Sequence, residues 1–258
     1  MINRSQLRAV FLDIDGTLMG KNPKALEENL SIIQKVRSLG HKVLINTGRA
    51  TSYMPRELNL QKNFDGVVSG AGAIVRLDGK VLFKKLMSFE IVRKACELFA
   101  DSPILSVLEG EENIYYFSKA EIDYENWVRL DKNNYRDIVT PDIAVEKFTI
   151  LGEISKEVCE VIGEECLSIQ HPAYGEIIRH DCSKASAMQI VADSLGIPLS
   201  QCVAMGDSMN DFDMIKAAGV SVAMDNAIDE IKAIADFVTD DADNAGVASA
   251  LKQIFNLN

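Results

Sequence analysis

The chain of 258 residues lacks the features of several protein classes. Its five cysteines form no CxxC pair and are odd in number, so a disulfide framework is not expected. We therefore expect a reducing, cytoplasmic compartment. No segment approaches the roughly 20 consecutive apolar residues that a membrane helix needs. The first residues show no long apolar stretch followed by a small-residue cleavage site. We therefore expect a cytoplasmic protein that does not enter a membrane.

Runs of Lys or Arg are also missing, and the formal net charge is -11. Binding to nucleic acid needs a cationic patch that neutralises phosphates, so this class of partner is not expected. An anionic substrate would need positive charge placed locally in its site. The hydrophobic content of 47% and charged content of 25% are ordinary for a globular protein. The length suits one large domain or two smaller ones.

The first part of the chain alternates strands and helices in the order of a parallel sheet. Apolar runs predict strands at residues 7–12, 42–46 and 66–69. A helix that begins at Pro23 and ends before Gly40 is expected between the first two strands, and a short helix at residues 51–58 between the second and third. Asp78-Gly79 then predicts a hairpin between two further strands. After residue 183 the alternation resumes with a helix to residue 195 and a strand at 201–205.

Residues 83–182 follow a different pattern, which predicts an inserted α+β cap. We expect one α/β, Rossmann-like parallel-sheet core built from residues 1–82 and 183–258, with the insert as a lid. Within the insert, Trp127 is interpreted as core rather than as a substrate platform, and residues 109–112 as a solvated turn. The expected elements of the insert are strands at 104–108, 114–117, 147–151, 166–170 and 176–179 and helices at 89–100 and 155–165.

Asp13-Ile14-Asp15-Gly16-Thr17 follows the first predicted strand. Two carboxylates that face one point repel each other unless a cation joins them or one is protonated, and both outcomes are typical of catalytic sites. A turn in which Asp or Thr side chains bind the local backbone would need no such site. The pentapeptide alone leaves both readings open.

Other polar residues follow the strands expected beside it. Thr47-Gly48-Arg49 ends the second strand, Gly206 to Asp211 follows the strand at 201–205, and Lys184 opens a helix, whose first N–H groups favour anions. Ligands of an open parallel sheet bind beyond the carboxyl ends of its strands. Each segment alone could be an ordinary turn, cap or solvated lysine. Together they suggest phosphoryl transfer, which needs a nucleophile, a hard cation and phosphate donors.

In their order along the chain, these four segments resemble the four motifs of the haloacid dehalogenase-like phosphatases: Asp13 to Thr17, Thr47-Gly48-Arg49, Lys184 and Gly206 to Asp211. The insert between the second and third motifs resembles a C2-type cap, and residues 221–227 with 246–248 resemble the Cof-type subgroup. Three positions depart from that pattern: Ala71, Asn46 and Asp225 stand where relatives often have Asn, a small residue and Gly. These departures leave the substrate open.

The resemblance implies a role for each motif residue. Asp13 would be the nucleophile that forms an aspartyl-phosphate, and Asp15 the acid and base that protonates the leaving group and activates water. Mg²⁺ would bind the Asp13 carboxylate, the Asp15 backbone carbonyl and Asp207. The remaining implied roles are catalysis by Thr47 and Lys184, substrate binding by Gly48, Arg49 and Asn210, and orientation of the metal site by Asp211.

The sequence therefore predicts an Mg²⁺-dependent hydrolase that removes phosphate from small phosphorylated metabolites, with sugar phosphates as the expected class. A phosphotransferase or mutase that uses the same intermediate is the nearest alternative. A non-catalytic sensor of phosphorylated metabolites is the alternative outside the enzymes.

Overall fold

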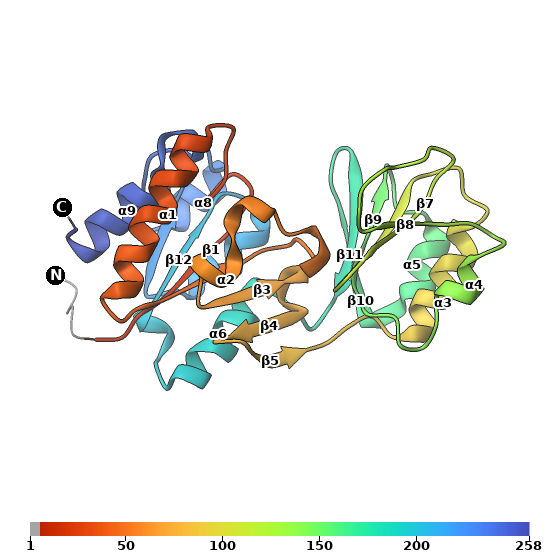
Figure 1. Cartoon of the computed structure of the whole chain (residues 1–258), viewed down its shortest axis with the longest axis horizontal. Helices are drawn as coiled ribbons and strands as arrows, with labels where there is room; N and C mark the ends of the chain where they lie inside the picture. The colour runs from red at the N-terminus through yellow and green to blue at the C-terminus, as the bar shows by residue number, and fades with distance from the viewer. Residues whose placement is uncertain (1–5, 258) are drawn as a thin grey trace. The chain divides into compact units, whose positions relative to one another are not determined.

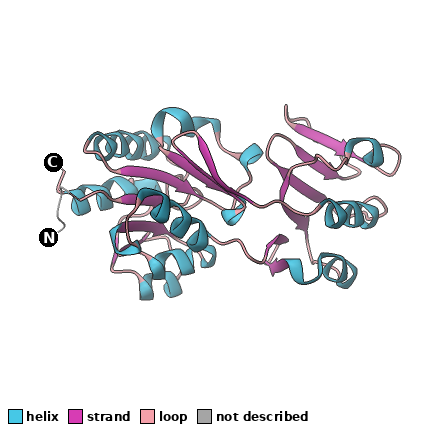
Figure 2. Ribbon diagram, turned by 90° about the horizontal axis from the view of Figure 1, so that it is seen from below, coloured by secondary structure: helices cyan, strands magenta, loops and turns pink. Residues whose placement is uncertain are grey.

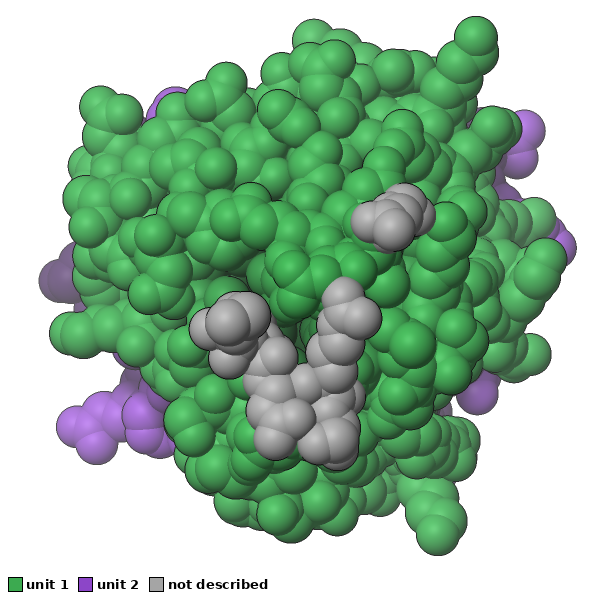
Figure 3. Space-filling model, turned by 90° about the vertical axis from the view of Figure 1, so that its left-hand side faces the viewer, with its two compact units in different colours: residues 1–48, 55–83, 183–258 green, residues 49–54, 84–182 purple. Residues whose placement is uncertain are grey.

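The computed structural model describes residues 6–257, which form two compact units. Unit 1 holds residues up to 48, residues 55–83 and residues from 183 onward; unit 2 holds residues 49–54 and 84–182 (Figure 3). Unit 2 thus takes a short piece from the first part of the chain, which the sequence had placed in the core. No helix within the described range is long and apolar enough to cross a membrane.

Unit 1 is built on an eight-stranded sheet, which confirms the predicted α/β class with a parallel-sheet core (Figure 1). Six of its strands run parallel, and β4 is antiparallel to β3. Strands β1 and β12, which pair with each other inside the sheet, are buried over their whole length, as expected for parallel strands covered on both faces. In spatial order the strands are β14 (Phe237–Val238), β13 (Val220–Ala223), β12 (Cys202–Gly206), β1 (Ala9–Leu12), β2 (Lys42–Asn46), β3 (Gly66–Ser69), β4 (Ile74–Leu77) and β5 (Lys80–Lys84).

The order of the strands reverses at β1, which lies between β2 and β12. Right-handed crossovers that lead in opposite directions from this point place their helices on opposite faces of the sheet. Accordingly, α1 packs with α9, while α6 packs with α7, and strands lie between the two groups (Figure 2). The helices of unit 1 are α1 (Pro23–Ser38), α2 (Leu60–Asn63), α6 (Lys184–Leu195), α7 (Phe212–Ala217), α8 (Asp229–Ile234) and α9 (Gly246–Phe255).

Local sequence accounts for the ends of these elements. The Asn22 side chain accepts a hydrogen bond from the backbone N–H of Lys24 and so caps α1, which Pro23 begins. Asp78 (φ 49°) and Gly79 (φ 75°) are both left-handed, as the predicted tight hairpin requires. Single-turn helices occupy several connections: η3 (Gly70–Gly72), η5 (Leu199–Gln201), η6 (Met209–Asp211) and η7 (Ala242–Asn244).

The prediction of a helix at residues 51–58 was wrong. Two single turns, η1 (Thr51–Tyr53) and η2 (Arg56–Leu58), stand in its place. Pro55 disfavours a helical conformation in the residue before it, and Met54 is indeed extended at φ −74° and ψ 133°. The interruption is also where the chain passes from unit 2 back to unit 1.

Unit 2 is a six-stranded sheet with helices α3 and α5 packed together on its apolar core (Figure 1). Neighbouring strands are antiparallel except β7 and β8. In spatial order the strands are β10 (Cys166–Gln170), β11 (Tyr174–Arg179), β9 (Val145–Leu151), β6 (Ser106–Gly110), β7 (Ile114–Phe117) and β8 (Trp127–Leu130); the helices are α3 (Phe89–Phe99), α4 (Tyr135–Ile138), α5 (Lys156–Ile162) and the single turn η4 (Gly163–Glu165).

Two features of unit 2 differ from the sequence-based expectations. Strand β8 and helix α4 occupy residues for which no element was predicted. The interpretation of residues 109–112 as a solvated turn was wrong for Glu109, which lies in β6 and is 7% exposed. Unit 2 therefore buries a carboxylate within its sheet.

Candidate active site

The acidic turn after β1 is fixed to the sheet and to a neighbouring loop. The backbone N–H of Asp13 donates to the carbonyl of Met205 in β12 at 3.2 Å, and the Asp13 side chain is buried. Gly16 adopts φ +77°, and a Cβ there would lie 2.4 Å from Asp207 Oδ2. Only glycine therefore allows the turn to approach Asp207. The Asp15 side chain is exposed.

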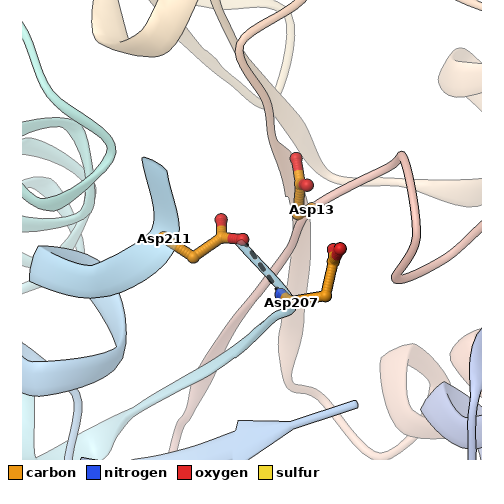
Figure 4. A group of neighbouring side chains, drawn as sticks. All are labelled: Asp13, Asp207 and Asp211. Carbon is orange, nitrogen blue, oxygen red and sulfur yellow. Dashed lines mark hydrogen bonds between the residues drawn. The ribbon is translucent and has the colours of Figure 1, made fainter. Parts of the chain in front are cut away.

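The loop after β12 brings a second pair of acids to the same place. Asp207 accepts a hydrogen bond from the Thr17 hydroxyl at 2.9 Å. Asp211 is fully buried, and its Oδ2 accepts from the backbone N–H of Asp207 at 3.0 Å (Figure 4). The same oxygen accepts from the backbone N–H of Ser208 at 3.2 Å. Asp211 thus folds the loop back and fixes the backbone that carries Asp207.

Lys184 lies between two of these carboxylates. The residue begins α6, where Ser183 and Ser186 cap each other's backbone N–H groups. Its Nζ is 2.8 Å from Asp13 Oδ1 and 2.6 Å from Asp211 Oδ1, and it donates to Asn210 Oδ1 at 3.0 Å. Burial alone would lower the pKa of Lys184, but the two carboxylates outweigh it and raise the pKa above its usual value. The side chain is therefore an ammonium ion over the whole physiological range.

The acids nevertheless carry more negative charge than Lys184 neutralises. Burial raises the pKa of Asp13 to about 7, against the opposing effect of Lys184. Burial likewise raises the pKa of Asp207 to about 6, although the hydrogen bond from Thr17 opposes the shift. Both values show that the ionised carboxylates lack sufficient compensation in the protein alone.

A hard divalent cation fits this surplus of charge. Asp13, Asp207 and Asp211 each offer a carboxylate oxygen, and the three oxygens lie within 4.8 Å of one another (Figure 4). All-oxygen donor sets suit Mg²⁺, Ca²⁺ or Mn²⁺ rather than softer metals. Because Asp211 is already occupied by Lys184 and two backbone N–H groups, Asp13 and Asp207 are better placed to bind such an ion directly.

Two of the three residues predicted from the second motif lie in unit 1. Thr47 is buried at the end of β2, and its backbone is paired with Val68 and Ala71. A Cβ on Gly48 would lie 3.6 Å from the Asn210 amide nitrogen, so this backbone passes close to the loop after β12. Arg49 belongs to unit 2, where its guanidinium lies 5.1 Å from the centre of the Tyr53 ring.

Two asparagines that the sequence did not place in the site support it. Asn226 donates to the carbonyl of Gly16 at 2.8 Å and accepts from the backbone of Ala242 at 3.0 Å. Asn46 is fully buried and donates to the carbonyl of Lys184 at 2.9 Å. Both residues stood in or beside recognised motifs, but their contacts join segments about 140 to 210 positions apart.

Comparisons with known proteins agree on one family. Residues 10–251 match the family described as haloacid dehalogenase-like hydrolase. The 5-amino-6-(5-phospho-D-ribitylamino)uracil phosphatase YcsE of Bacillus subtilis is 30% identical over 95% of both chains.

Solved structures show the same fold. The phosphatase BT1666 of Bacteroides thetaiotaomicron superposes with a TM-score of 0.77 at 26% identity, over 100% of this chain and 99% of its own. The sugar phosphatase BT4131, described as subclass IIB of the same superfamily, gives a TM-score of 0.77 at 24% identity over 97% and 100%.

Proposed function

The chain belongs to the family of haloacid dehalogenase-like hydrolases and is a phosphatase of that superfamily; on that premise we propose that it is an Mg²⁺-dependent enzyme that hydrolyses phosphate monoesters of small metabolites through an aspartyl-phosphate. The observation that carries the proposal is the buried contact of Lys184 with Asp13 beside Asp207 and Asp211. This arrangement supplies a nucleophile, a fixed positive charge and oxygen ligands for a cation.

Asp13 is the proposed nucleophile. One of its carboxylate oxygens contacts Lys184, and its backbone is anchored to β12, so the side chain is held in one orientation. The other oxygen attacks phosphorus, the bond from phosphorus to the leaving oxygen breaks, and an aspartyl-phosphate forms. Lys184 offsets negative charge on Asp13 and on the phosphoryl group during this step.

Asp15 is the proposed proton carrier. It donates a proton to the leaving oxygen and then removes one from the water that hydrolyses the aspartyl-phosphate. Its side chain is exposed, whereas Asp13 is buried, so the two acids occupy different environments although only one residue separates them. Different environments allow neighbouring carboxyl groups to take opposite roles.

The phosphoryl group is proposed to bind at Thr47, Gly48, Asn210 and the Arg49 side chain. Asp13, the Asp15 backbone carbonyl and Asp207 would hold Mg²⁺, and Asp211 would orient them. When bound, the ion neutralises phosphate oxygens and lowers the repulsion that Asp13 and the phosphoryl group otherwise meet.

Sugar phosphates are the proposed substrate class. One structural neighbour is described as a sugar phosphatase, and the relative YcsE is named for a substrate that carries a phosphorylated ribityl chain. Both names indicate phosphate esters with a polyhydroxylated carbon chain, and the proposal assigns such a phosphate to the charged groups gathered around Asp13 in unit 1.

The test is release of inorganic phosphate from ribose 5-phosphate and acetyl phosphate, with Mg²⁺ or with EDTA, by the wild type and Asp13→Asn. The proposal expects turnover that needs the metal and that Asp13→Asn abolishes. In ¹⁸O-labelled water the released phosphate should carry label; substrate consumed with formation of a new phosphate ester, and without labelled phosphate, would indicate transfer to another acceptor. If neither compound is hydrolysed and both still bind, a non-catalytic sensor of phosphorylated metabolites becomes the better account.

A further inference from the structure

Two buried polar side chains, Arg8 and His41, lie at the amino ends of β1 and β2. Arg8 is 7% and His41 4% exposed. Ala9 and Lys42 are the first pair in the register of the two strands, and the backbone N–H of Lys42 donates to the carbonyl of Arg8 at 2.9 Å. Arg8 and His41, one position earlier, are therefore neighbours on one face of the sheet. We call these two residues the amino-edge pair.

The amino-edge pair lies at the opposite end of β1 from the candidate active site. Arg8 precedes β1 and Asp13 follows it, so the four residues of the strand, or about 13 Å, lie between them. The His41 ring packs on Phe255 of α9, with ring centres 4.6 Å apart. The pair therefore belongs to unit 1 and is distinct from the acidic site.

Polar atoms of the amino-edge pair are buried without hydrogen-bond partners. Within residues 6–257, no group forms a hydrogen bond with Nε or Nη1 of Arg8 or with either ring nitrogen of His41. Burying a donor without an acceptor is costly, above all for a charged group, and such groups in native proteins point to an ordered water or ion. These nitrogens therefore call for an acceptor.

A second arginine of unit 1 shows the satisfied arrangement. Arg37 in α1 donates to both carboxylate oxygens of Asp65, through Nε at 3.0 Å and Nη2 at 3.1 Å. Arg37 is only partly buried, so it could also have been solvated by water. Arg8 is more deeply buried, yet no carboxylate of residues 6–257 forms an ion pair with it.

The described groups around Arg8 leave its charge unbalanced. Burial lowers the pKa of Arg8, and only the Cys202 thiol opposes this shift. Burial raises the pKa of that thiol to about 11, so it is neutral at pH 7. Burial and the charge of Arg8 lower the pKa of His41, whose ring is therefore neutral as well. Arg8 itself stays a cation, because a guanidinium does not lose its proton in proteins.

We propose that the amino-edge pair is a binding site for a small oxyanion, either an inorganic one such as phosphate or a carboxylate. A guanidinium binds carboxylate and phosphate oxygens strongly, and a neutral imidazole offers one further N–H donor. The bound ion supplies the acceptors that these nitrogens call for and balances the charge of Arg8. The site does not depend on the proposed function, because it lies apart from the acidic residues to which that function is assigned.

A titration followed at His41 tests the site directly. The imidazole ¹⁵N signals of the three histidines are recorded in EDTA at pH 7, and His41→Gln identifies the signal of His41. Sulfate, phosphate or acetate then replaces a bulky organic anion at constant ionic strength. The proposal expects a saturable shift of the His41 signal with at least one of these ions. A signal that stays constant with all three would overturn the proposal and leave water as the acceptor.

The choice of ions also identifies the ligand. A response to acetate alone assigns a carboxylate, and a response to sulfate or phosphate assigns an inorganic oxyanion. Chloride carries charge but no oxygen, so it should give no saturable shift. A shift with chloride that matches the shifts with the oxyanions contradicts the assignment to an oxyanion.

Two arginine variants separate a specific site from a general effect of salt. Arg8→Met removes the charge and keeps most of the side-chain volume, and it should weaken binding of the ion at least about tenfold. Arg37→Met removes the arginine that Asp65 already satisfies, and it should leave the affinity within about twofold. Equal affinities in Arg8→Met and the wild type would contradict the site.

Thermal unfolding of the wild type gives a measurement that needs no variant. The ion that shifts the His41 signal should raise the melting temperature with the dissociation constant found by titration. Sulfate and phosphate also stabilise proteins in general, by exclusion from their surfaces, but that effect does not follow a binding curve. A rise without the curvature of that dissociation constant would count against the site.

Discussion

Each unit of this protein buries one lysine between two carboxylates, yet the two sites differ in their balance of charge. In unit 1, Lys184 contacts Asp13 and Asp211 and is 2% exposed. In unit 2, Lys147 pairs with Glu176 and lies 3.8 Å from Glu109, and it is 4% exposed. Burial alone does not separate the two arrangements.

The pKa values of the partner acids do separate them. In unit 1 the pKa of Asp13 is raised, because burial and Asp211 outweigh Lys184. In unit 2 burial would also raise the pKa of Glu176, but Lys147 and a hydrogen bond with His171 outweigh it, so the pKa is lowered. The carboxylate of Glu176 is thus stabilised by its partners within the fold, whereas that of Asp13 is not, which favours a further cation beside Asp13. This difference is what distinguishes a candidate site from a closed ionic network.

The largest expected effect is on kcat, when each of the two lysines is replaced by methionine in a separate variant. Lys184→Met should lower kcat for acetyl phosphate about a thousandfold, because a positive charge fixed beside the reacting carboxylate is lost. Lys147→Met should keep kcat within a few-fold at a temperature where it is folded. Steady-state kinetics of the two variants decide; equal losses would mean that the two networks do not differ in function.

Lys147→Met should instead destabilise the protein by about 3 kcal/mol, because Glu109 and Glu176 are left buried without their ion-pair partner. Urea unfolding measures the change. The matched control adds Glu109→Gln and Glu176→Gln to Lys147→Met, which removes the unpaired charges and should recover most of the stability. A destabilised control would show that packing, not charge, explains the loss.

Mg²⁺ should stabilise unit 1 selectively. At a concentration about 100 times its dissociation constant, the ion raises the free energy of unfolding by about 2.7 kcal/mol. Thermal unfolding with Mg²⁺ or EDTA should show this increase for the wild type and for Glu176→Gln, and a much smaller one for Asp207→Asn. An undiminished increase in Asp207→Asn would remove Asp207 from the metal site.

The smallest expected effect is on how the stability of the metal-free protein depends on pH, which should change in opposite directions in Asp13→Asn and Glu176→Gln. Folding raises the pKa of Asp13, so its ionised form destabilises the fold increasingly from about pH 4 to about pH 7. Asp13→Asn should therefore be more stable than the wild type at pH 8, with the difference vanishing toward pH 4.

Glu176→Gln should behave in the reverse way. Folding lowers the pKa of Glu176, so its stabilisation is present above its unfolded pKa and is lost as the pH falls through the folded value. This variant should be less stable than the wild type at pH 7 and approach it in acid. Melting temperatures of both variants across this range give the comparison, and parallel curves would contradict it.

The sequence predicts the core sheet well because its strands are short, continuous apolar runs that end at polar motifs. It fails where tertiary contacts decide. Strand β8 is four residues long and pairs with β7, and its Trp127 packs on Tyr116, which no local pattern announces. Glu109, Lys147 and Glu176 meet because β6, β9 and β11 are neighbours in register, so their ionic network could not be derived from spacing.

The same reasoning applies to the candidate site. Asp13, Lys184 and the loop to Asp211 were predicted to meet because three strand ends and one helix end define a single edge of the sheet. The placement of Arg49 in unit 2 was not predicted, because the covalent neighbours Thr47 and Gly48 lie in unit 1. A motif that spans a unit boundary gives no sign of it in its own sequence.

The short segment 49–54 has a practical consequence for building hybrid proteins from this family. The chain crosses between the units at four junctions, after residues 48, 54, 83 and 182. A chimaera that exchanges residues 84–182 alone would leave Thr51 and Ser52 facing foreign counterparts of Glu146 and Gly110. Exchanging unit 2 between relatives therefore calls for two grafts, in which a six-residue piece travels together with residues 84–182.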